Sequence, residues 1–305
     1  MKAQELVVDL GSEQVTIPYV RLVGTAGDGP HLTVIAGVHG TEYTSIAAAR
    51  EWARELCEDE IRGQVTVVPV VNLPAFWARS PFVVPLDGKN LNRTFPGRAD
   101  GSAAERLAAA VTETFIVGSD HLLDLHAGDL PEALEPFTLY DESPVGDRAR
   151  ELALAYGLGH VVRQAAAGRT VGGSTSAVAA DLGIPAITAE SGQCGILERE
   201  SVERHLRGLR NVARFLGILD GEAERYPTPV EHDSWLWLRT GAAGWWQPTV
   251  ATGQDVEAGA LLGTVAPILG DGPVEVRAPA AGVPLFITSS PAVTADGLLM
   301  GLALS

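Results

Sequence analysis

The sequence predicts an α/β sheet covered by helices on both faces, followed by a small all-β domain. Strand-like and helix-like segments alternate from about residue 18 to residue 218. Prolines and charges interrupt this pattern around Tyr226-Pro227-Thr228-Pro229, which is typical of a linker. Beyond it the chain has only short β-like segments separated by glycines. We therefore predict two domains, residues 1–226 and residues 227–305.

The first domain is expected to alternate strands with amphipathic helices. In the clearest helix, Thr44–Leu56, the apolar residues Ile46, Ala49, Trp52 and Leu56 share one face. The other predicted helices are Ala103–Phe115, Arg148–Tyr156, Ser174–Asp181 and Val202–Leu216, and the predicted strands are Leu32–Ala36, Gln64–Val71, His121–Leu125 and Pro185–Ala189. In such a sheet, active residues are expected at the carboxyl ends of the strands.

The second domain is expected to be built from short strands. These are Trp235–Arg239, Gly244–Pro248, Leu261–Val265, Val274–Ala278 and Val283–Thr288. The segment 249–263 resembles the turn-rich half of biotinyl and lipoyl carrier domains, so a barrel of that kind is expected. Such carriers need a modifiable lysine at a hairpin tip, and the chain has no lysine after Lys89. A carrier role is therefore excluded, and the domain is expected to be structural, a lid or a contact in a homo-oligomer.

The composition excludes several classes of protein. The net charge of −16 argues against binding to nucleic acid or to an anionic membrane surface. The two cysteines, Cys57 and Cys194, cannot form a disulfide framework or a cysteine-rich zinc site. The first residues lack a basic region followed by an apolar one, and no apolar run approaches the length of a membrane span. A cytoplasmic enzyme is the default expectation.

The most informative residues are His39 and Glu42, at a predicted turn from strand to helix. A histidine and a glutamate three residues apart can bind one metal ion from one side, but a third ligand must come from elsewhere. Among the other histidines, His126 is the candidate, because it also ends a hydrophobic strand. Two histidines and one glutamate form a catalytic zinc shell that leaves a position open for water. Asp124 precedes His126 by two residues on the same strand and could orient a ligand.

The remaining histidines are weaker candidates for the metal site. His31 and His121 start strands, at the end of the sheet opposite the expected site. His205 lies among the charged residues of a predicted helix and is expected to be solvated.

A zinc hydrolase also needs a group that takes a proton from water and gives it to the leaving amine. Glu190 directly follows an apolar strand and precedes Ser-Gly, which suits this role, although a helix-capping or surface glutamate is the alternative. Asn92 and Arg93 lie in a loop and could grip a carboxylate, since the guanidinium offers a bidentate fork. The alternative for this pair is a turn with a surface arginine.

Four ordered motifs make the chain resemble the aspartoacylase/succinylglutamate desuccinylase family, which shares the fold of zinc metallocarboxypeptidases. The motifs are His39-Gly40-Thr41-Glu42, Asn90-Leu91-Asn92-Arg93-Thr94-Phe95-Pro96-Gly97, Asp124-Leu125-His126 and Thr188-Ala189-Glu190-Ser191-Gly192. The resemblance spans roughly residues 30 to 195, and the small C-terminal β domain also resembles that of the family. It implies a mixed sheet flanked by helices and a substrate that is a small N-acyl amide.

The resemblance also implies roles for individual residues. It implies one zinc ion held by His39, Glu42 and His126, with Glu190 as general base and acid. Asn92 and Arg93 would bind a carboxylate or the substrate backbone. The family often has another arginine a few residues earlier, and Arg79 is the nearest replacement in this chain. Arg169 is a weaker candidate for a substrate contact, and Cys194 is expected to be a small buried residue that could line the pocket.

Three functions are compatible with these residues. The first is hydrolysis of an N-acetyl or N-succinyl amino acid or diamine to a carboxylate and an amine. The second is a metallocarboxypeptidase that acts on peptides with the same zinc shell. The third is a non-enzymatic binding protein, which the presence of every expected catalytic residue disfavours.

Overall fold

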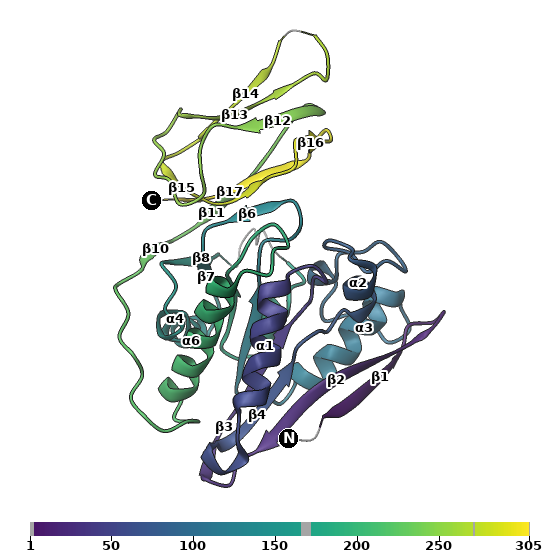
Figure 1. Ribbon diagram of the computed structural model, residues 1–305, viewed down its shortest axis with the longest axis vertical. Coiled ribbons are helices and arrows are strands. Elements are labelled where there is room, and N and C mark those ends of the chain that lie inside the picture. The colour runs from purple at the N-terminus through teal and green to yellow at the C-terminus, as the bar shows by residue number, and fades with distance from the viewer. Residues whose placement is uncertain (1–2, 166–171, 271, 305) are drawn as a thin grey trace.

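The computed structural model describes residues 3–165, 172–270 and 272–304. Its largest unit is a nine-stranded mixed sheet (Figure 1). In spatial order the strands are β1 (Gln4–Asp9), β2 (Gln14–Val23), β4 (Arg62–Val68), β3 (Gly27–Ala36), β5 (His121–His126), β9 (Ala186–Glu190), β7 (Phe137–Asp141), β8 (His160–Gln164) and β10 (Val230–His232). The expected α/β class with a mixed sheet is confirmed.

The four strands predicted from the sequence are the four neighbours β4, β3, β5 and β9, which run parallel to one another. Parallel strands covered on both faces are apolar along their whole length, so they are easy to recognise in a sequence. The missed hairpin of β1 and β2 lies at the sheet edge, where exposed and buried residues are mixed. The predicted strand Gln64–Val71 ends early, at Val68, because Pro69 has no N–H to give to a neighbouring strand.

Helices cover both faces of the sheet. The helices α1 (Tyr43–Glu55), α4 (Gly146–Tyr156) and α6 (Arg199–Phe215) pack on one face, around a core that includes Trp52. The helices α3 (Ala103–Val111) and α5 (Thr175–Asp181) pack on the other face, and the short helix α2 (Leu73–Ala78) adjoins them. Figure 1 shows α1, α4 and α6 on one side of the molecule and α2 and α3 on the other. All four residues expected on the apolar face of the first helix are buried.

The helix predicted at Ala103–Phe115 changes character before its end. Regular α-helix stops at Val111, and a π-helical turn, Thr112–Ile116, follows it.

The C-terminal β region, residues 227–305, is all-β in its described part, as expected. One four-stranded sheet contains β11 (Trp235–Arg239), β17 (Leu298–Leu304), β15 (Gly282–Thr288) and β6 (Glu132–Leu134). The other contains β14 (Val274–Arg277), β13 (Leu261–Ala266), β12 (Gly244–Pro248) and β16 (Ala292–Val293). The bounds of β11 and β12 are those predicted, whereas β17 was not predicted.

Two strands connect the α/β part to the C-terminal β region. The strand β6 comes from the α/β part of the chain but pairs with β15. Conversely, β10 follows the linker but pairs with β8 in the nine-stranded sheet. These two strand pairings hold the C-terminal β region against the nine-stranded sheet. The region is seen in the upper part of Figure 1. The domain boundary at 226/227 and the likeness to a biotinyl or lipoyl barrel stay predictions.

Within the described ranges, no helix combines the length and apolar character that crossing a membrane requires.

Candidate active site and metal centre

The His39–Glu42 turn lies between the end of β3 and the start of α1. Two glycines allow the chain to make this turn against its neighbours. Gly37 has φ of +65°, a left-handed conformation that glycine adopts without strain. A Cβ on Gly40 would lie 2.3 Å from the backbone carbon of Ala75, so only glycine fits where the turn meets α2. The turn is therefore held in one conformation by backbone packing.

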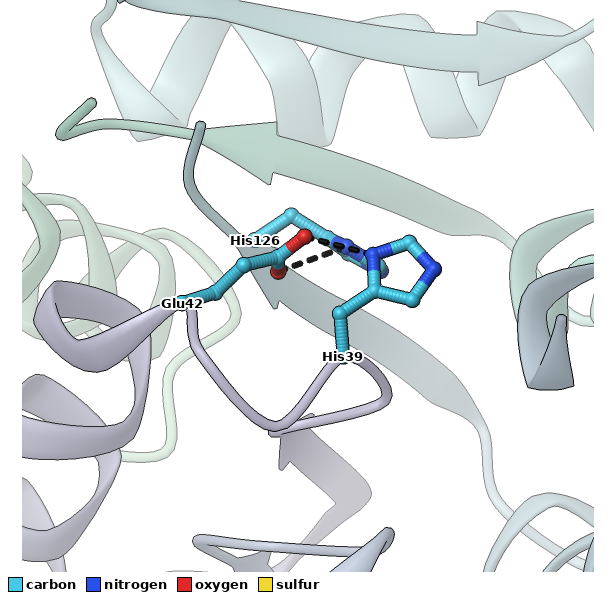
Figure 2. Close-up of side chains that lie close together, drawn as sticks. All are labelled: His39, Glu42 and His126. Carbon is cyan, nitrogen blue, oxygen red and sulfur yellow. Dashed lines mark hydrogen bonds and ion pairs between the residues drawn. The ribbon is translucent and has the colours of Figure 1, made fainter. Parts of the chain in front are cut away.

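The structure brings His39, Glu42 and His126 together. The Glu42 carboxylate faces a ring nitrogen of each histidine, as Figure 2 shows. Its Oε1 is 2.5 Å from His39 Nδ1, and its Oε2 is 2.9 Å from His126 Nδ1. All three side chains are buried. One ligand atom from each residue lies within 4.8 Å of the others, so the three form a group that can hold a metal ion.

Hydrogen bonds on the far side of each ring fix which nitrogen is free. Asn90 Oδ1 accepts the backbone N–H of Asn92, so it is an acceptor toward His39 Nε2, 3.2 Å away. Asp124 Oδ2 lies 2.9 Å from His126 Nε2 and can only accept a proton from it when ionised. Both rings therefore bear their proton on Nε2 and direct the lone pair of Nδ1 toward Glu42.

This arrangement fits a metal ion. A lone pair and a carboxylate oxygen cannot lie 2.5 Å apart unless a proton or a cation lies between them. Burial lowers the pKa of both histidines, but the neighbouring carboxylates more than compensate, so the pKa values of His39 and His126 are raised. Burial alone would raise the pKa of Glu42, yet the two imidazoles lower it to about 2. The three residues together thus stabilise positive charge at their centre, and the outer partners Asn90 and Asp124 are those expected behind metal-binding histidines.

Glu190 lies beside this group at the end of β9. It is paired in register with His126 on the adjacent strand β5, so the two strand ends meet. Burial raises the pKa of Glu190 well above its ordinary value, and the carboxylates of Glu42 and Glu132 add to this effect, whereas His126 opposes it. A carboxyl group with a raised pKa can both accept and donate a proton near neutral pH.

Asn92 and Arg93 line the same cavity, which has a volume of about 620 Å³. Both belong to a 3₁₀ turn, Leu91–Arg93, that follows Asn90. The Arg93 guanidinium lies 5.2 Å from the ring centre of Trp237 on β11, a cation–π contact across the two parts of the chain. Asn92 is buried, and its Oδ1 has no hydrogen-bond partner among the described residues, so it is available to a ligand.

Arg79 is not brought to the cavity. It caps the C-terminus of α2 in a left-handed conformation, is exposed, and does not line the cavity with Arg93. Arg169 lies outside the described residues. Cys194 is half-buried rather than buried and is not among the residues that line the cavity.

His205 corrects the expectation from the sequence. It is fully buried rather than solvated, because it lies on the face of α6 that packs against the sheet. Its Nε2 donates to the backbone carbonyls of His126, at 3.0 Å, and of Ser191, at 3.2 Å. Its Nδ1 accepts a hydrogen bond from the hydroxyl of Tyr156, at 2.7 Å. His205 thus connects the strand ends that bear His126 and Glu190.

Among the residues of the cavity wall that sequence reasoning missed are Glu132, Trp235, Trp237 and Arg239. The last three occupy alternate positions of β11 and therefore share one face of the strand. This alternation could be seen in the predicted strand, but the sequence did not predict where the strand lies relative to the active site. Among the described residues, neither buried indole N–H of this pair of tryptophans has a partner, so both are available to a ligand.

Comparisons with known proteins agree with this geometry. Residues 28–216 match the succinylglutamate desuccinylase/aspartoacylase catalytic domain. The chain is 31% identical over 266 residues to the N-alpha-acetyl-L-2,4-diaminobutyric acid deacetylase of Halomonas elongata, with 84% of this chain and 77% of that protein covered.

Two solved structures are similar over nearly the whole chain. The product-bound ectoine utilization protein EutE (DoeB) from Ruegeria pomeroyi has a TM-score of 0.87 at 25% identity, covering 99% of this chain and 94% of that one. A succinylglutamate desuccinylase/aspartoacylase from Rhodobacter sphaeroides shares the fold, with a TM-score of 0.88 at 24% identity and the same coverage. Because the catalytic-domain match spans more than half of the sequence, the chain belongs to the succinylglutamate desuccinylase/aspartoacylase family and is an amidohydrolase.

Proposed function

We propose that the protein is a zinc-dependent deacylase that hydrolyses a small N-acyl amino acid or N-acyl diamine. The observation that carries this proposal is the convergence of His39, Glu42 and His126 beside Glu190 in one cavity. The acetyl group is favoured as the acyl group by the relative that acts on N-alpha-acetyl-L-2,4-diaminobutyric acid. We further propose that the enzyme is cytoplasmic.

The proposed zinc ligands are His39 Nδ1, the Glu42 carboxylate and His126 Nδ1. A zinc ion bound there would supply Lewis acidity toward the acyl carbonyl and the attacking water. The choice of zinc over other divalent metals rests on the two imidazoles and one carboxylate, a ligand set common in zinc hydrolases.

Glu190 is assigned the proton transfers. As a base it takes a proton from the attacking water, and as an acid it gives that proton to the nitrogen of the leaving amine. The amide C–N bond breaks, and the products are a carboxylate and an amine. Asn92 and Arg93 are proposed to hold the carboxylate of the amino acid, since Arg93 offers a bidentate fork and the side-chain N–H₂ of Asn92, in the same cavity wall, can donate to a carboxylate oxygen.

Metal analysis and a substrate panel test the proposal. We expect one zinc per chain, loss of hydrolysis after removal by a chelator, and recovery when zinc is returned. A panel of N-acetyl and N-succinyl amino acids and diamines should contain a substrate. No bound zinc together with no turnover would overturn the proposal, and release of C-terminal residues from peptides would favour a metallocarboxypeptidase instead.

The role of Glu190 is tested by Glu190→Gln. Because glutamine keeps the shape but cannot carry the proton, we expect kcat to fall about 10²- to 10⁴-fold while zinc remains bound. The surface variant Glu200→Gln is the control and should keep full activity. Unchanged turnover in Glu190→Gln would remove Glu190 from the mechanism.

A further inference from the structure

Glu132 is an acidic residue of the cavity wall that has no role in the proposed mechanism. It is the first residue of β6, the short strand that joins the C-terminal β region, and its cross-strand partner is Thr288. Glu132 and Thr288 both line the cavity that contains Glu42 and Glu190. Its position is thus fixed by strand pairing rather than by a free loop.

The carboxylate of Glu132 is poorly compensated. Its Oε2 accepts one hydrogen bond, from the backbone N–H of Asp129 at 3.1 Å. In the described part of the chain, no lysine or arginine nitrogen lies within 4.0 Å of it, whereas Glu42 is matched by His39 and His126. Burial, reinforced by the carboxylate of Glu42, raises the pKa of Glu132 to about 7, although the hydrogen bond from Asp129 and the charge of His39 oppose this rise. A cation bound beside Glu132 would favour its ionised form.

The cavity wall contains basic and acidic groups, and the charge of Glu132 opposes the lowering of the Arg93 pKa that burial causes. Arg93 and Arg239 line it and can meet a carboxylate, and the two unpartnered indole N–H groups of Trp235 and Trp237 add neutral donors. Glu132 is the acidic group left over once Glu42 is assigned to the metal and Glu190 to proton transfer. A substrate that carries both a carboxylate and a distal ammonium group has a partner for each.

We propose that Glu132 binds the distal ammonium group of an N-acyl diamino acid and so selects this class over N-acyl derivatives of acidic amino acids. This inference rests on the proposed deacylase function and names its substrate class. A charge-assisted hydrogen bond between ammonium and carboxylate gives affinity, and an acidic side chain at the same place is repelled. Glu132 is a specificity residue in this proposal and takes no part in the proton transfers.

Three substrates with matched shapes test the proposal in the unaltered enzyme. They are N-acetyl-2,4-diaminobutyrate, N-acetyl-2-aminobutyrate, which lacks the ammonium group, and N-acetylaspartate. We expect kcat/KM for the first to exceed that for the second by about 10-fold or more, from the usual strength of a hydrogen bond between charged groups. Equal values for the first two, or a preference for N-acetylaspartate, would overturn the proposal.

The variant Glu132→Gln assigns the preference to this side chain. We expect KM for the diamino substrate to rise about 10- to 100-fold, with kcat little changed and N-acetyl-2-aminobutyrate unaffected. Glu135→Gln, three residues away and outside the cavity wall, is the matched control and should keep the preference. An equal loss of kcat on both substrates would show a different role for Glu132.

A binding measurement separates failure of this inference from failure of the deacylase proposal. Calorimetric titration with 2,4-diaminobutyrate and with 2-aminobutyrate needs no turnover. If no amide is hydrolysed but the diamine binds about 10-fold more tightly than the monoamine and Glu132→Gln removes the difference, the ammonium site stands without the reaction. If amides are hydrolysed and Glu132→Gln changes neither binding nor KM, the ammonium site is wrong.

Discussion

His39 and His126 each have one ring nitrogen held by an outer oxygen and the other facing Glu42. The outer partner of His126 is itself buried and held, because Asp124 Oδ2 also accepts a hydrogen bond from the hydroxyl of Thr175. Asp124 thus sets both the tautomer of His126 and the orientation of its ring. At the scale of single residues, the affinity for metal therefore depends on side chains that would not touch it.

Asp124→Asn is predicted to weaken zinc binding about 10- to 100-fold, because the neutral amide holds the imidazole less firmly and lowers its basicity. Competition with a chelator measures the affinity directly. Asp120→Asn, at the other end of the same strand segment, is the control and should bind zinc as the parent does. An unchanged affinity in Asp124→Asn would contradict this role.

The element that aligns the site is α6, although none of its residues lines the cavity. Its buried face packs against the sheet, and His205 reaches the carbonyls that follow β5 and β9. Thr44 of α1 makes a further contact of this kind, donating to the carbonyl of Ser191 at 2.7 Å. The two strand ends are thereby joined to the helices that cover one face of the sheet.

His205→Leu is predicted to lower both stability and turnover. It removes one donor from each of two buried carbonyls and the acceptor of the Tyr156 hydroxyl, which costs about 1–3 kcal/mol in the free energy of unfolding. Because the ends of β5 and β9 lose their common anchor, kcat should fall as well. Chemical denaturation and steady-state kinetics measure the two effects.

Arg204→Gln is the control for this prediction. Arg204 lies one position away on α6 and pairs with Glu200 at the surface, so its loss should change stability by less than about 1 kcal/mol. If His205→Leu resembled Arg204→Gln in both measurements, α6 would not align the site.

The molecule as a whole forms its cavity between the nine-stranded sheet and the C-terminal β region. The metal-binding group lies on the sheet side, and β11, β15 and β17 supply part of the opposite wall. The pairing of β6 with β15 and of β10 with β8 joins the two parts and holds these walls in place. The C-terminal β region therefore contributes to the substrate pocket rather than lying apart from it.

Trp237→Leu is predicted to weaken substrate binding, because Arg93 loses the ring that holds its guanidinium. A cation–π contact of about 0.5–1 kcal/mol or more corresponds to a rise in KM of a few-fold, with a smaller change in kcat. Trp245→Leu is the control, since Trp245 is exposed on β12 and outside the cavity. Equal KM values for the two variants would exclude the contact between Trp237 and Arg93 from substrate binding.

The sequence by itself determined the parts of the protein whose signals are local. The central strands β3, β4, β5 and β9 are continuous apolar runs. The residues at their carboxyl ends can therefore be identified from the sequence, because they directly follow these runs. This made His39, Glu42, His126 and Glu190 recognisable as one set, and the structure brings these four residues together.

Only the tertiary structure decided which distant segments complete the cavity. Glu132 and Trp237 lie in short strands with no motif, and their relation to Glu190 depends on how β6 and β11 pair. The burial of His205 and the exposure of Arg79 likewise depend on which side of a helix faces the sheet or the solvent. The physical reason is that hydrophobic periodicity is a property of neighbouring residues, whereas packing between segments far apart in the chain fixes where a side chain lies.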